Sequence, residues 1–123
     1  MVELSEEQFE KIVAQALDDM PAWISYRVQN LAVVIHPWPT PRQIQKSQKE
    51  GKMLLGLYEG IPLTRRGHGY RLVPPDRITL FQQPLQRIAR DEEDLERLIR
   101  RTVIHEIGHH FGLSEKDLKN LDF

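Results

Sequence analysis

Three residues near the end of the chain, His105, Glu106 and His109, have the types and the spacing of a metal site. Histidines four residues apart lie one turn apart on one face of a helix, so both imidazoles can reach the same ion. The glutamate between them is not needed as a ligand and is placed to take a proton from a metal-bound water. The pattern therefore predicts a zinc site and metal-assisted hydrolysis, with Glu106 as general base.

A third ligand is expected after the helix, because a catalytic zinc ion needs three protein ligands and an open position. Gly112 lets the chain turn sharply, and Glu115 then returns toward the metal. Asp117 is the competing acid. The alternative interpretation of Glu115 is a first-turn glutamate that the helix dipole stabilises. We predict one zinc ion per chain, held by His105, His109 and Glu115.

Three further residues near the predicted site are assigned other roles. His110 points about 100° away from His109 around the helix, which favours packing or hydrogen bonding over ligation. His68 and Tyr70 belong to a loop that precedes the last predicted strand, from which they could contact substrate or steady a developing oxyanion. The alternative is that these two side chains serve only the structure of the loop.

The helix that carries the motif is predicted to run from about Asp91 to Phe111. Its first residues are acidic, which stabilises a helix N-terminus, and Gly112 can adopt the positive φ that ends a helix. Four apolar residues face away from the two predicted histidine ligands, and we expect them to pack on a sheet. They are Val103, Ile104, Ile107 and Phe111.

The other elements follow from local patterns. Ser5 and Gln8 form a capping box for a helix that ends at Pro21, and Ser114 is placed to cap a final short helix. Residues 42–52 are expected to form a surface loop or a ragged helical turn, and residues 60–75 an irregular loop. Three runs of apolar and β-branched residues predict strands: 27–36, 53–58 and 76–82.

The composition limits the class of protein. The 123 residues suit a single domain, residues 1–123, and a net charge of −1 without a basic patch argues against nucleic acid as a partner. The absence of cysteine excludes disulfides and any cysteine-based zinc site. No signal peptide and no transmembrane stretch is recognised, so we expect no membrane association and a cytoplasmic location.

The motif resembles that of the zincin metallopeptidases. Its continuation to Gly112 and Glu115 is similar to the metzincin pattern, with Glu115 where those enzymes usually carry a third histidine, although no methionine follows the motif. The chain as a whole resembles the small bacterial family of minimal zincin-like metallopeptidases, whose third ligand is typically Asp. The segments that carry this resemblance are MVELSEEQFEKIVAQALDDMP (1–21), LLGLYEGIPLTRRG (54–67), PPDRITLFQQPL (74–85) and VIHEIGHHFGLSEKDL (103–118).

This resemblance implies an α+β fold. It would comprise an N-terminal helix, a small mixed β-sheet and a long C-terminal active-site helix followed by a short helix. It also implies a zinc metallopeptidase that hydrolyses peptide bonds in a peptide or protein substrate. In zincins the substrate lies along an edge strand of the sheet, and by analogy Arg77–Gln82 is the candidate strand.

Two other functions stay open. The chain could be a metal-dependent peptide-binding module, catalytically weak or inactive, that keeps the zincin scaffold. Alternatively, zinc could be structural, in which case His110 or Asp117 would have to supply the fourth protein ligand. The structural alternative leaves Glu106 without a purpose, and we rank it last.

Overall fold

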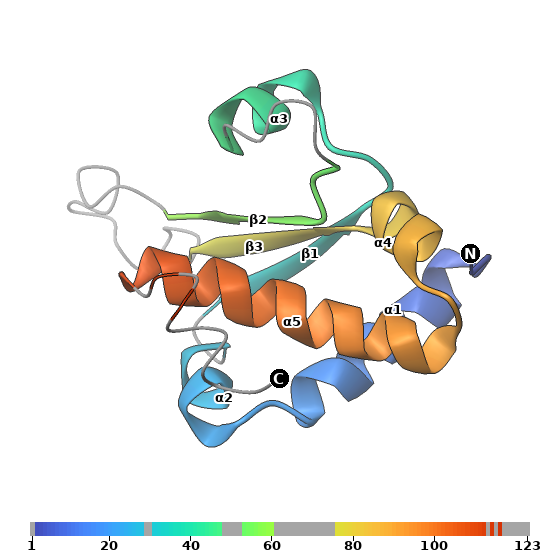
Figure 1. Ribbon diagram of the computed structural model, residues 1–123, viewed down its shortest axis with the longest axis horizontal. Helices are drawn as coiled ribbons and strands as arrows, with labels where there is room; N and C mark the ends of the chain where they lie inside the picture. The colour runs from blue at the N-terminus through green and yellow to red at the C-terminus, as the bar shows by residue number, and fades with distance from the viewer. Residues whose placement is uncertain are drawn as a thin grey trace, which may run out of the picture.

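A three-stranded sheet lies between helices in the structure, a computed structural model that describes residues 2–28, 31–47, 53–60, 76–112, 114 and 116 (Figure 1). The described part contains five helices and three strands, which confirms the predicted α+β class. In chain order they are α1 (Glu6–Asp18), α2 (Ala22–Val28), β1 (Ala32–His36), α3 (Pro41–Ser47), β2 (Gly56–Glu59), β3 (Arg77–Phe81), α4 (Gln82–Ile88) and α5 (Glu92–His110).

The sheet has the strand order β1-β3-β2. β3 pairs in parallel with β1, so that Ile78 lies opposite Val33, and it pairs antiparallel with β2, so that Ile78 also lies opposite Tyr58. The prediction that Arg77–Gln82 forms an edge strand is therefore wrong, because β3 has a hydrogen-bonded neighbour on each side and Gln82 already belongs to α4. Among the described strands the edges are β1 and β2.

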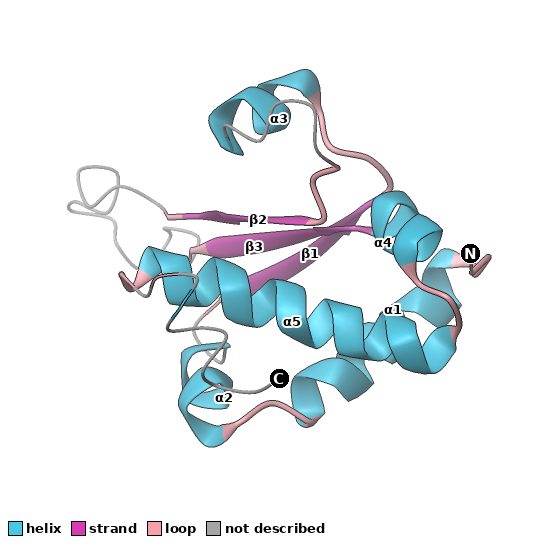
Figure 2. Ribbon diagram, viewed as in Figure 1, coloured by secondary structure: helices cyan, strands magenta, loops and turns pink. Residues whose placement is uncertain are grey.

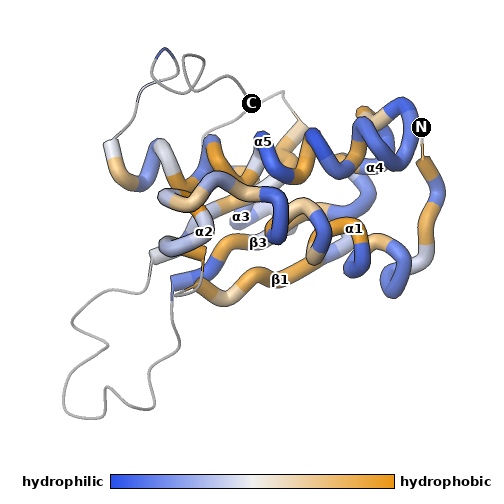
Figure 3. Tube along the Cα trace, turned by 90° about the horizontal axis from the view of Figure 1, so that it is seen from below, coloured by the Kyte–Doolittle hydropathy of each residue, from blue (hydrophilic) through white to orange (hydrophobic). Residues whose placement is uncertain are grey.

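The helices lie on both faces of the sheet. α1 and α5 cross one face, and α3 lies over the other (Figure 2). The main core forms between the sheet and the helix pair, where the chain is most hydrophobic along β1 and β3 (Figure 3). Fully buried side chains there come from α1, α2, β3, α4 and α5 and include Phe9, Ile24, Ile78, Leu80, Leu85, Leu95, Ile99 and Ile107. This packing holds the second half of α5 against the sheet.

α5 has the ends that its sequence predicts. The Asp91 side chain accepts a hydrogen bond from the Asp94 amide at 2.8 Å, and Gly112 has a φ of 85° directly after the helix. Val103, Ile104 and Ile107 are buried as expected. Phe111 is 49% exposed, which contradicts the prediction that it packs on the sheet. It is the C-cap residue of α5, and its ring lies edge-on to that of His110.

Three short helices complete the predicted elements. Pro21 follows α1 and also begins α2, because its carbonyl accepts hydrogen bonds from Ile24 and Ser25. The predicted strand 27–36 consequently shortens to Ala32–His36. Of the two alternatives for residues 42–52, a surface loop or a helical turn, α3 agrees with the helical one as far as Ser47. α4 was not predicted, and it follows β3 without a side-chain cap. The loop 60–75, apart from Gly60, and the final short helix lie outside the described residues. No helix in the described ranges is long and apolar enough to cross a membrane.

Candidate metal and active site

The motif residues lie in the last two turns of α5, beside the edge strand β2. His105 and Glu106 are half-buried and His109 is exposed. The rings of His105 and His109 are edge to face, with their centroids 6.1 Å apart. The helix therefore presents both imidazoles on one face, as their spacing predicts.

The two imidazoles lie near the separation that a shared zinc ion requires, but somewhat farther apart. Two imidazoles bound to one tetrahedral zinc ion through nitrogens at about 2.0–2.1 Å have centroids roughly 5 Å apart, about 1 Å closer than the 6.1 Å between His105 and His109. The described part of the chain contains no cluster of three or more His, Cys, Asp or Glu side chains that could hold a metal. Glu115 and Asp117, the two candidates for the third ligand, lie outside the described residues, and so do His68 and Tyr70. The third ligand thus stays a prediction.

The carboxylate of Glu106 lies at the outer edge of β2, the edge that faces away from β3. Its Oε1 accepts a hydrogen bond of 3.0 Å from the Tyr58 backbone N–H. The Phe81 N–H donates to the Leu55 carbonyl at 3.0 Å, so the backbone groups of Leu55 and Leu57 face β3 while those of Gly56 and Tyr58 face outward. An edge N–H of the sheet therefore holds Glu106 in place.

The side chain of Tyr58 ties the same strand to the end of α5. Its ring stacks on His110 with the centroids 4.0 Å apart, and its hydroxyl donates to Asp76 Oδ2 at 2.8 Å. His110 consequently packs against β2, in the role that its direction on the helix predicts. The arrangement separates His110 from the face that carries His105 and His109.

A pocket of about 280 Å³ adjoins the site. One wall is the segment that leads into β2, residues 53–56, and the other is α5 from Leu98 to Glu106. β2 approaches α5 most closely at Gly56, where a Cβ atom would lie 2.7 Å from the Thr102 Cγ2. The absence of a side chain at Gly56 is therefore what allows the edge strand to lie this close to the motif helix.

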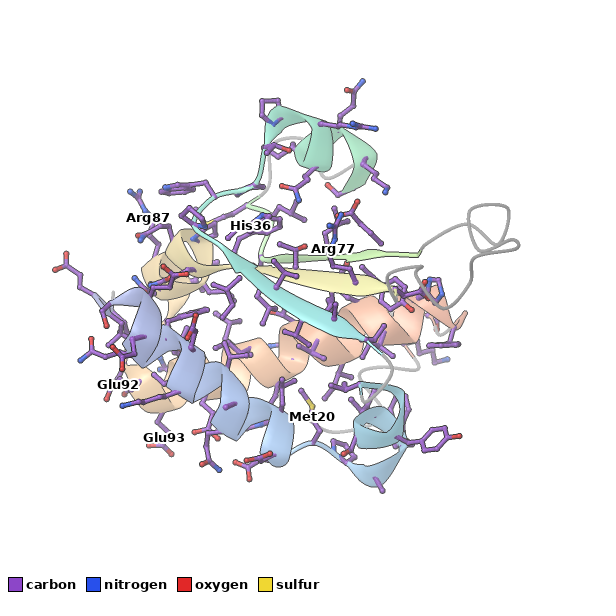
Figure 4. The ribbon with its side chains drawn as sticks, turned by 180° about the vertical axis from the view of Figure 1, so that it is seen from behind. Met20, His36, Arg77, Arg87, Glu92 and Glu93 are labelled. Carbon is purple, nitrogen blue, oxygen red and sulfur yellow. The ribbon has the colours of Figure 1, made fainter. Side chains whose placement is uncertain are left out.

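Ion pairs hold the far end of β2 from the opposite face of the sheet. Glu59 pairs with Lys46 of α3 at 3.0 Å and with Arg77 of β3 at 3.3 Å. Figure 4 shows Arg77, together with His36, on the side of the sheet that faces α3. Burial raises the pKa of Glu59, but the two cations outweigh burial and hold it below its ordinary value. These contacts fix the strand that carries Tyr58.

Comparison with known proteins identifies the family of this chain. The family model for zincin-like metallopeptidases matches residues 28–122. The chain belongs to this family. A conserved hypothetical protein from Thermus thermophilus has a similar structure, with a TM-score of 0.57 at 24% sequence identity, over 96% of this chain and 100% of that one. At that identity the likeness concerns the fold alone. No curated protein matches the chain.

Two residues of this zincin-like site were missed by the motif analysis, namely Tyr58 and Asp76. Tyr58 supplies the N–H that holds Glu106, and Asp76 accepts the hydroxyl of Tyr58. Both belong to segments that carry the resemblance to the family, 54–67 and 74–85. That was the available signal, but it did not indicate a contact between residues 48 positions apart.

Proposed function

We propose that this zincin-like chain is a zinc-dependent peptidase that hydrolyses peptide bonds. Its single zinc ion would be held by His105, His109 and Glu115, of which the first two present their imidazoles on one face of α5 with centroids 6.1 Å apart. The observation that carries the proposal is the position of the Glu106 carboxylate, which accepts a hydrogen bond from the outer edge of β2 while the two imidazoles lie on the same two turns of α5. When bound, zinc supplies Lewis acidity that activates a water and polarises a carbonyl.

Glu106 would act as the general base. A base must be held within hydrogen-bonding reach of the proton that it takes. The hydrogen bond from the Tyr58 N–H orients the carboxylate, and ion pairs and stacking anchor the strand that donates it. In the proposed reaction Glu106 takes a proton from the attacking water and passes it to the leaving amine.

The substrate would be a peptide or protein segment in extended form. Among the described residues no backbone group pairs with the outward N–H and carbonyl of Gly56, and a substrate in extended form could add to the sheet there. β2 thus replaces the strand Arg77–Gln82 as the proposed edge for substrate. A peptide paired with Gly56 would lie close to Glu106, which is bonded to the same strand edge, and close to the 280 Å³ pocket that Gly56 and Glu106 both line.

The first experiment is native mass spectrometry of untagged protein, followed by peptide hydrolysis assays of wild type and Glu106→Gln. We expect one zinc ion per chain in both proteins and cleavage only by wild type. The matched control is Glu93→Gln, which removes the same charge from the exposed beginning of α5 (Figure 4). This control should cleave like wild type.

Three results would contradict the proposal. Equal hydrolysis by Glu106→Gln would show that Glu106 is not the base. A protein that takes up no zinc would show that Glu115 does not complete the site. Zinc-dependent peptide binding without cleavage by wild type would instead establish the alternative, a peptide-binding module on a zincin scaffold.

A further inference from the structure

The pocket beside Glu106 has room for a substrate side chain. Its volume of about 280 Å³ lies at the lower end of the range of ligand sites, about 300–1,000 Å³. Met53 and Leu55 on one wall and Leu98 on the other give it apolar sides. A substrate residue next to the cleaved bond could therefore place its side chain here.

The pocket also contains a cation, the guanidinium of Arg101. Arg101 lines it, one helical turn before His105, and is exposed. The other two arginines of α5 are paired, Arg97 with Asp94 at 2.6 Å and Arg100 with Glu96 at 2.8 Å. Within the described ranges no carboxylate pairs with Arg101.

From these observations we propose that the pocket selects a substrate residue with an acidic side chain, glutamate above all. This inference rests on the proposed peptidase function and adds the substrate class. The methylene groups of a glutamate would contact Leu55 and Leu98, and its carboxylate would meet the guanidinium of Arg101. Arginine is suited to this role because its planar fork can donate two parallel hydrogen bonds to one carboxylate.

The effect should be moderate, because Arg101 is exposed to solvent. A hydrogen-bonded ion pair at such a position favours a charged over a neutral isosteric side chain by about threefold to tenfold. The preference should shrink as salt is added, since ionic strength screens exposed charges. Glutamine is the matched neutral substrate residue because it has almost the same shape as glutamate.

The test uses peptides of one sequence that carry Glu or Gln at each position on either side of the cleaved bond. The zinc-loaded wild type is expected to show a kcat/KM about threefold to tenfold higher for Glu at one of these positions. Arg101→Gln should abolish that preference, and Arg101→Glu should reverse it in favour of Lys. The control Arg97→Gln loses a charge on the same helix outside the pocket and should keep the preference.

A wild-type enzyme that cleaves Glu and Gln peptides equally at every position would overturn the inference, as would a preference that survives Arg101→Gln. If no peptide is cleaved, the peptidase proposal fails, but the inference about the pocket can still be tested. The affinity of the protein for the same peptides, carrying a fluorescent label, is then measured by fluorescence anisotropy. Tighter binding of the Glu peptide that depends on Arg101 supports it. Equal binding of the Glu and Gln peptides refutes it.

Discussion

Gly56→Ala tests whether the close contact between β2 and α5 is as tight as the structure indicates. A Cβ at this position would lie 2.7 Å from the Thr102 Cγ2 and 3.2 Å from the Thr79 carbonyl oxygen. Carbon atoms in good contact are about 3.5–4.0 Å apart, so the first contact is short by roughly 1 Å. The Thr79 oxygen belongs to β3, which is paired on both sides and cannot easily move.

The expected cost follows from two opposing effects. Overpacking of a close-packed interior costs about 1–3 kcal/mol of unfolding free energy. Replacing glycine by alanine also restricts the unfolded chain, which stabilises the folded state by about 0.4–1 kcal/mol. The steric clash should outweigh the effect on the unfolded chain. We expect a net decrease of about 1–2 kcal/mol in the free energy of unfolding, and a decrease in Tm of about 3–10 °C for a domain of this size.

The assay is urea and thermal unfolding of a double-mutant cycle with Thr102→Ser. Serine lacks the methyl group that clashes but keeps the hydroxyl, which in Thr102 donates to the Leu98 carbonyl at 2.8 Å. The double variant should therefore recover part of the loss, with a coupling energy of about 1 kcal/mol. Gly60→Ala is the control, because a Cβ there meets only atoms at 3.6 Å or beyond and should change stability by less than about 0.5 kcal/mol.

A Gly56→Ala protein as stable as wild type would refute the reasoning, since it would mean that β2 does not need glycine to approach α5. Additive losses in the cycle would also refute it, because they would place the strain elsewhere than at Thr102. Activity provides a second readout. A shift of β2 moves the Tyr58 N–H away from Glu106, so Gly56→Ala should also hydrolyse peptides more slowly.

Two further predictions concern zinc binding and the stability of the protein at acidic pH. His109→Asn should lower the zinc affinity by more than about tenfold, measured in competition with a chelator, whereas His110→Asn should retain zinc because His110 stacks on Tyr58. An equal loss of affinity in both variants would contradict the assignment of His109 as a ligand. The hydrogen bond from Arg97, with help from Arg90, lowers the pKa of Asp94 from 3.8 to about 2, and a carboxyl with a lowered folded-state pKa stabilises the protein above its unfolded pKa. That contribution is lost as pH falls from about 4 to 2. The urea midpoint of wild type should therefore fall more steeply over this range than the midpoint of Asp94→Asn. Parallel curves for the two proteins would count against a stabilising Asp94–Arg97 ion pair.

Local sequence determined the helix that carries the site. Its acidic start, its apolar stripe and Gly112 all act within a few residues, so the pattern was sufficient to place α5 and to put His105 and His109 on one face. The capping box of Ser5 and Gln8 placed α1 for the same reason. A similar local signal fixes the start of α3, which the sequence left open between a loop and a helical turn. Thr40 and Gln43 exchange the same pair of hydrogen bonds, and Pro41 occupies the first helical position.

Tertiary structure alone decided what surrounds that helix. Strand order depends on how distant segments pair, so the sequence of β3 predicted a strand without showing that β1 and β2 would flank it. The contact of Tyr58 with Glu106 joins residues 48 positions apart, and no local periodicity encodes it. Likewise, Arg101 gains a candidate role only because the segment that leads into β2 closes a pocket over it. The candidate metal ligands and the candidate base were recognisable in the sequence. The groups that orient the base, and those that line the pocket beside it, are brought there only by long-range packing.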